Sequence, residues 1–206
     1  MHRTAYNLAP YTLYEEPLAP LTGTQSQLPV ILSEYRFYKI SDIDNYLKLL
    51  TRTPEYFRSI LNFEHTKSES GLFMASYTAD SIIKECRDFV NLKESNYLYS
   101  SFVERLEELA SAKDGVLTEK QREAYTRQNN VYIKKYIFPA YEQLISGLSE
   151  LRSSGKNNNG LCYLPNGRTY YEYLVRSETG SSRSIAELQT LRMHRFFRIL
   201  QLCSEC

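Results

Sequence analysis

Apolar residues recur three and four positions apart along most of the chain, which is the spacing of one face of an α-helix. Alternation of apolar and polar residues, the pattern of a half-buried strand, is scarce. The pattern therefore predicts an all-α protein, an irregular array of about six to seven helices. The clearest apolar sets are Ile43, Tyr46, Leu47 and Leu50; Ile82, Ile83, Cys86, Phe89 and Val90; Leu98, Phe102, Leu106 and Leu109; and Tyr141, Leu144, Ile145 and Leu148.

Prolines and capping residues indicate where helices begin or are interrupted. Thr53 followed by Pro54 predicts a new helix start, because proline at the first helical position gives up an amide that has no partner there. Thr118 and Gln121 have the spacing of a capping box and predict a second start. Pro139 lies inside the longest apolar stripe, so we expect a kink in a helix that otherwise continues.

The regions between the helical stretches suggest a division of the chain. Residues 1–40 begin with a proline-rich segment and are predicted to form an extended N-terminal arm. Residues 41–191 form the predicted helical domain, and residues 192–206 form a divergent C-terminal tail. Residues 161–164, which lie between an Asn-rich loop and a Pro-Asn-Gly turn, are the one candidate for a short strand.

Composition excludes several classes of protein. The chain is 42% hydrophobic and 24% charged, close to globular averages. The net charge is +1 and the basic residues are dispersed, which argues against nucleic-acid binding. No apolar run approaches the roughly 18 residues of a membrane span. No signal peptide is visible, and the sequence leaves the localisation unknown.

The cysteines and histidines do not form a recognisable metal or redox motif. Cys203 and Cys206 make a Cys-x-x-Cys pair, but they end the chain, whereas a redox pair precedes a helix. The His-Glu-x-x-His spacing of zinc peptidases is absent. His65 and Glu69 lie four residues apart, and a surface ion pair is favoured there over a metal site. We therefore predict no catalytic residue and no metal ligand in this chain.

One polar and aromatic cluster is a candidate binding site. Arg168, Tyr170 and Tyr171 come at the predicted start of a helix, where free amides and the helix dipole favour an anion such as a carboxylate. These residues would then form a rim that binds a peptide-like substrate. The alternative is that the tyrosines only pack beneath the Asn-rich loop at 153–160, and the sequence favours that simpler interpretation.

Several separate motifs occur in an order that resembles a known bacterial family. They are Leu28-Pro29-Val30, Glu34-Tyr35-Arg36-Phe37, Asp44-x-Tyr46-Leu47-x-Leu49-Leu50, Gly71-Leu72-Phe73-Met74, Pro139-Ala140-Tyr141, the run from Asn158 to Pro165, Tyr170-Tyr171-Glu172-Tyr173-Leu174 and Thr179-Gly180. Together they resemble the family called domain of unknown function 885. The resemblance covers about Tyr11 to Leu191, beyond which the sequence departs from the family pattern.

The resemblance implies a larger parent protein. Members of the family are longer, largely helical, similar to zinc metallopeptidases of the His-Glu-x-x-His class, and often exported or lipid-anchored. Zinc is therefore expected for full-length members. Their metal motif lies downstream of the matched region, so the resemblance carries no catalytic residue onto this chain. It implies instead the middle helical portion of such a protein, truncated before the metal motif.

Two function hypotheses follow. In the first, the chain is a non-catalytic segment that forms part of a substrate-cleft wall in a metallopeptidase-like protein and is inactive alone. In the second, it is a stand-alone helical protein-interaction module. The expected partners are a peptide substrate or the remainder of a longer protein, with self-association through exposed apolar faces.

Overall fold

The computed structural model describes residues 9–112, 117–155 and 158–193, and these are helical with no strand. The predicted all-α class is confirmed. The chain divides into a larger unit, Leu13–Asn158, and a smaller one made of residues 1–12 and 159–206. The predicted boundaries, which divide the chain into residues 1–40, 41–191 and 192–206, differ from this division and stay predictions. The α-helices are α1 Thr24–Ser33, α2 Ile40–Glu69, α3 Ser76–Asn91, α4 Tyr97–Ser111, α5 Glu119–Tyr132, α6 Phe138–Leu151 and α7 Gly167–Thr179, and residues 185–193 are also helical.

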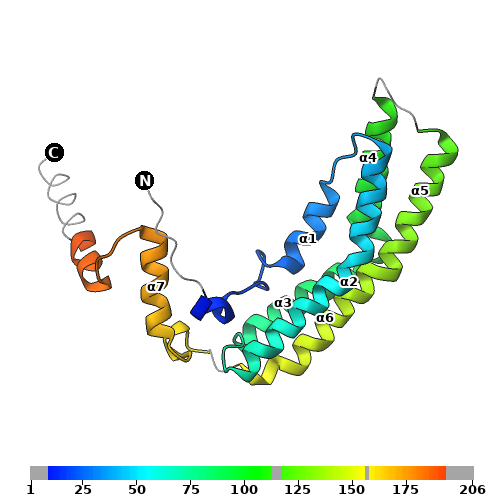
Figure 1. Ribbon diagram of the computed structural model, residues 1–206. Helices are drawn as coiled ribbons and strands as arrows, with labels where there is room; N and C mark the ends of the chain where they lie inside the picture. The colour runs from blue at the N-terminus through cyan, green and yellow to red at the C-terminus, as the bar shows by residue number, and fades with distance from the viewer. Residues whose placement is uncertain (1–8, 113–116, 156–157, 194–206) are drawn as a thin grey trace, which may run out of the picture. The chain divides into compact units, whose positions relative to one another are not determined.

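The core of the larger unit lies where α2 and α3 each pack against α6 (Figure 1). The helix α2 is continuous over 30 residues, so the predicted new start at Pro54 is wrong. The apolar stripe continues in phase across the proline, with Leu50 before it and Phe57 after it, both fully buried. Burial of this stripe outweighs the backbone hydrogen bond that Pro54 cannot make.

The helices α5 and α6 form one long rod, which is interrupted just before Pro139. The rod continues in the same direction after the interruption, as the sequence predicts (Figure 1). The interruption takes the form of a π-helical turn, Ile133–Ile137, in which the Phe138 amide donates to the Ile133 carbonyl. A widened turn just before a proline accommodates both the missing amide and the bulk of the ring. The turn keeps Ile133 and Ile137 in the core.

The N-terminal segment contains a helix where an extended arm is predicted. The helix α1, Thr24–Ser33, packs against α3 and α4. It is held at its start by Glu85 of α3, whose carboxylate accepts hydrogen bonds from the Leu21 amide at 3.0 Å, the Gln25 side chain at 3.0 Å and the Ser26 hydroxyl at 2.9 Å. The prediction for residues 24–33 fails because these tertiary contacts, rather than local propensity, stabilise the helix.

The smaller unit contains α7 and a short 3-10 turn, Leu161–Tyr163, in place of the candidate strand. The turn packs so closely on the start of α7 that a Cβ at Gly167 would lie 1.8 Å from the Leu161 carbonyl oxygen. Only glycine permits that approach. Asn166 precedes it with a φ of 52°, a left-handed conformation that asparagine tolerates.

Candidate functional site

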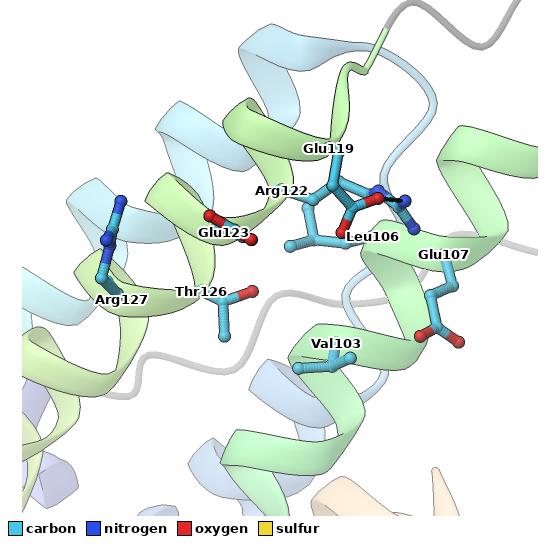
Figure 2. Close-up of a pocket in the computed structure, with 8 residues that line it drawn as sticks. All are labelled: Val103, Leu106, Glu107, Glu119, Arg122, Glu123, Thr126 and Arg127. Carbon is cyan, nitrogen blue, oxygen red and sulfur yellow. Dashed lines mark hydrogen bonds and ion pairs between the residues drawn. The ribbon is translucent and has the colours of Figure 1, made fainter.

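A surface groove of about 330 Å³ lies between α4 and α5 (Figure 2). Its α4 side carries Val103, Leu106 and Glu107, and its α5 side carries Glu119, Arg122, Glu123, Thr126 and Arg127. Leu106 is 1% exposed and Val103 is partly buried, so the floor of the groove is apolar. The charged side chains stand around this floor.

The groove exists because α5 turns a polar face toward α4. Glu119, Arg122, Glu123 and Thr126 have the spacing i, i+3, i+4 and i+7, which places them on one side of the helix. On the α4 side, two of the three lining residues, Val103 and Leu106, are apolar. Long charged side chains keep their ends in water, so the first turns of α5 cannot close onto α4 as a dry core. Within α5 only Asn129 is fully buried.

The start of α5 is well defined, as the sequence predicts. The Thr118 amide donates to the Gln121 side chain at 2.9 Å, and the Gln121 amide donates to the Thr118 hydroxyl oxygen at 3.3 Å. This capping box fixes the first turn and with it the backbone of Glu119 and Arg122. Glu119 also lies where the helix dipole favours a negative charge.

The charges in the groove are only partly paired. Arg122 forms an ion pair with Glu119, which Figure 2 draws as a dashed line. The Nε of Arg122 is buried and has no hydrogen-bond partner among the described residues. Within the described residues, no salt bridge is formed by Glu107, Glu123 or Arg127. The groove therefore offers donors and acceptors of both charge signs beside an apolar floor.

The three residues predicted as a binding rim lie on α7, but they do not all lie on the same face of the helix. Arg168 is exposed and forms an ion pair with Glu172 at 3.4 Å, and Tyr171 is 48% exposed. Tyr170 is partly buried and packs against two other rings, with centroid distances of 5.4 Å to Tyr11 and 6.2 Å to Tyr173. Arg168 and Tyr171 are three residues apart and share a helix face, whereas Tyr170 is turned away from both.

The tyrosine cluster gives part of the rim a packing role. Tyr11 and Tyr173 stack with centroids 4.6 Å apart, and Tyr170 completes the group. Aromatic pairs of this kind stabilise the unit, in whose described part Leu164 is the one hydrophobic residue that is buried. Tyr170 thus packs against Tyr11 and Tyr173, while packing beneath the Asn-rich loop and a binding role for Arg168 and Tyr171 both stay predictions.

The described part of the chain contains only some of the cysteines and histidines, namely His65, Cys86 and Cys162. Within residues 9–112, 117–155 and 158–193, no three His, Cys, Asp or Glu side chains come together as a metal site. Cys86 is in the core as predicted, and burial raises the pKa of its thiol to about 12. Cys203, Cys206 and most of the predicted tail lie outside the described residues.

No helix in the described part of the chain is long and apolar enough to span a membrane.

The groove was not predicted from the sequence, although a signal was present. Charged residues in α5 follow helical spacing opposite an apolar stripe in α4, and a mismatch of that kind indicates an open seam between two helices. The sequence alone does not say which helices pack together. That information was needed to recognise the mismatch.

Comparison with known proteins gives two results. The sequence pattern of a family described as "Bacterial protein of unknown function (DUF885)" matches residues 2–202, which is wider than the predicted range Tyr11 to Leu191. A crystal structure titled as the "putative lipoprotein" from Colwellia psychrerythraea has the same fold, with a TM-score of 0.78 at 17% sequence identity. The similarity covers 89% of this chain and 31% of that one, so this chain spans about a third of its length. No curated protein matches the sequence.

Proposed function

The chain belongs to the bacterial DUF885 family, and from that premise we propose that it is a non-catalytic helical segment of a metallopeptidase-like protein, with the α4–α5 groove as part of a peptide-cleft wall. The observation that carries the proposal is the structural comparison. Nearly all of this chain has the fold of one portion of a much larger protein. An arrangement of helices found within a larger protein is suited to forming one side of a site that other segments complete.

The chemistry of the groove suits a polypeptide. Val103 and Leu106 provide an apolar floor for aliphatic side chains, and burying such side chains contributes binding free energy. The partly exposed guanidinium of Arg122 is a donor for a backbone carbonyl or a carboxylate. Glu107 and Glu123 are acceptors for amides or basic side chains. Because the groove carries charges of both signs, it would orient a bound peptide without strongly preferring an acidic or a basic one.

The α7 residues are a second, weaker part of this proposal. Arg168 keeps an exposed guanidinium at a helix start, which is suited to the carboxylate of a peptide once its pair with Glu172 is broken. Tyr171 lies beside it on the same face and offers a ring and a hydroxyl. Zinc and hydrolysis belong in this proposal to the full-length family members and not to these residues.

The test is to combine a binding assay with a cleavage assay on the purified chain. A fluorescent mixed-sequence peptide library is titrated with parent, R122Q and R52Q proteins, and the same peptides are incubated with zinc and analysed by mass spectrometry. Arg52 is the matched control because it forms an i, i+3 pair with Glu55 on α2, outside the groove. We expect weak binding that R122Q reduces and R52Q does not, with no cleavage. One-to-one zinc binding with cleavage would contradict a non-catalytic role.

The alternative is a stand-alone helical interaction module. It is favoured by large apolar side chains on the surface of the larger unit, including Tyr38 at 76%, Ile31 at 60% and Val131 at 56% exposure. Such side chains are typical of a protein-binding surface where they lie together in one patch. This function predicts that I31S weakens association with a protein partner or a second copy, while R122Q has no effect on it.

A further inference from the structure

A second pocket, of about 350 Å³, lies in the larger unit and is remote in sequence from the α4–α5 groove. It is formed where the N-terminal segment crosses α2. Ile60, Phe63 and Pro17 give it apolar walls, and Ser59 is the one uncharged polar residue in its lining. The acidic residues Glu15 and Glu16 complete the lining of the pocket.

Directly beside this pocket, Lys67 is buried with no exposed surface. Its ammonium donates to the Glu16 carboxylate at 2.8 Å and to the backbone carbonyl of Glu15 at 2.8 Å. It also lies 5.8 Å from the centre of the Phe63 ring. A buried ammonium needs such partners, because its transfer out of water is otherwise very costly.

A second carboxylate, that of Glu64, is fully buried near the same ammonium. Neither of its oxygens has a hydrogen-bond partner among the described residues, and the closer one is 3.8 Å from the Lys67 nitrogen. That distance is too long for a hydrogen bond. Desolvation is the main cause that raises the pKa of Glu64 to about 7, and repulsion from Glu16 adds to it. The structure thus has one buried cation beside two carboxylates, those of Glu16 and Glu64, and the carboxylate of Glu64 has no hydrogen bond among the described residues.

We propose that the pocket binds an ammonium or guanidinium group on an alkyl chain, with Glu16 as its acceptor. The ligand cation takes the place of Lys67 at Glu16, and the Lys67 ammonium moves from 3.8 Å to hydrogen-bonding distance of Glu64. The exchange gives the buried carboxylate its missing partner and balances the excess negative charge. The alkyl part of the ligand lies against Ile60 and Phe63.

The proposal identifies the ligand class as alkylamines and basic side chains. It goes beyond the proposed peptide-cleft function, because it uses no residue of the α4–α5 groove and holds whether or not that groove binds a peptide. Arg122 variants should leave it unchanged. Failure of one proposal is therefore separable from failure of the other.

The test is an NMR titration of the full chain with n-pentylamine, agmatine and the neutral analogue 1-pentanol. Both amines should give saturable shifts at the amides of Glu16, Ser59 and Phe63, and 1-pentanol should not. E16Q should weaken amine binding by about tenfold or more, through loss of a charge-assisted hydrogen bond. E64Q should weaken it by a smaller factor, because Lys67 then has no carboxylate to move to. E55Q, which removes an exposed carboxylate from the same helix, should have no effect.

Three results would overturn the proposal. They are the absence of saturable shifts in the parent protein, equal binding of 1-pentanol and n-pentylamine, and amine binding that E16Q and E55Q affect equally. The comparison of the amine with the alcohol uses the unaltered chain, so it decides the question even where a variant fails to fold. Folding of each variant is checked by the dispersion of its amide resonances.

Discussion

The hydroxyl of Tyr141 in α6 donates a 2.6 Å hydrogen bond to the backbone carbonyl of Gln25 in α1. That carbonyl is the one that Pro29 leaves without a donor, because proline has no N–H to offer the residue four positions earlier. Tyr141 is 1% exposed, and its burial raises the pKa of the hydroxyl far above the usual value, so the group stays a donor. A side chain remote in sequence thus replaces a helical hydrogen bond and fastens α1 to α6.

This relationship predicts coupling between the two sites. Y141F should lower the free energy of unfolding by about 1–3 kcal/mol, because it leaves a buried carbonyl without a partner. In a P29A background, an amide at residue 29 can donate to Gln25, and the same Y141F change should cost less. A double-mutant cycle by urea unfolding, followed by circular dichroism, measures the difference. Equal costs of Y141F in both backgrounds would show that the two residues act independently.

The buried Glu64 predicts a pH dependence of stability. Its pKa is raised from 4.5 to about 7 by burial. Between these pH values the folded state holds a proton that the unfolded state releases, so stability falls as pH rises through this window. E64Q removes that loss. It should therefore be more stable than the parent by about 2–3 kcal/mol at pH 8 and similar to it at pH 4.

Urea unfolding across pH 4–8 measures this effect, with E55Q as the control for loss of an exposed carboxylate on the same helix. Parallel stability curves for the parent and E64Q would rule out the proposed titration. The prediction does not depend on ligand binding at the neighbouring pocket, since it concerns the free protein.

Local pattern predicts most helices of the larger unit but misses α1, and it is misleading at two of the three prolines within these helices. Pro54 reads as a helix start and Pro29 as part of an extended arm, yet both lie inside helices. In each case packing supplies what the local rule lacks: a continuous buried stripe for Pro54, and the Tyr141 hydroxyl for Pro29. At Pro139 the continued direction of the helix is predictable because the apolar stripe resumes in phase after the proline.

The candidate sites are harder to predict from the sequence than the helices are. Arg168 and Tyr171 are recognisable from the turn before α7, but the division of roles with Tyr170 depends on Tyr11, which is remote in sequence. Glu64 and Lys67 read as ordinary polar residues of a helix, three positions apart. Their burial results from the chain segment around Glu15 that crosses α2, a contact between residues about 50 positions apart.

Asn96 is predicted to be a strong contributor to stability. It is 1% exposed, its side-chain oxygen accepts from the Leu98 amide at 3.1 Å, and its nitrogen donates to the Phe89 carbonyl at 3.1 Å. N96A removes the cap of α4 and the link to α3 together, and should cost about 2–3 kcal/mol. T118A, which removes the exposed cap of α5, should cost about 1 kcal/mol or less. Comparable losses in the two variants, measured by thermal unfolding, would contradict the role of burial.

Gly167 is predicted to be essential for the smaller unit. A Cβ there would lie 1.8 Å from the Leu161 carbonyl oxygen, a backbone atom that cannot move without shifting the whole turn. G167A should therefore disrupt the start of α7 and the tyrosine cluster, at a cost of about 3 kcal/mol or more. Limited proteolysis should cut G167A between residues 159 and 180 faster than it cuts the parent.

Gly147 provides the control for that change, because a Cβ there would meet the Leu61 side chain at 2.7 Å, and Leu61 can adjust its rotamer. G147A should leave proteolysis of the smaller unit unchanged. The ring resonances of Tyr11 and Tyr173, whose centroids lie 4.6 Å apart, report on the same unit directly. The opposite result is that G167A preserves those resonances and resists the protease as the parent does. That result would show that the turn before α7 can shift to accommodate a Cβ, and that its close approach to the helix is not needed for the fold of the unit.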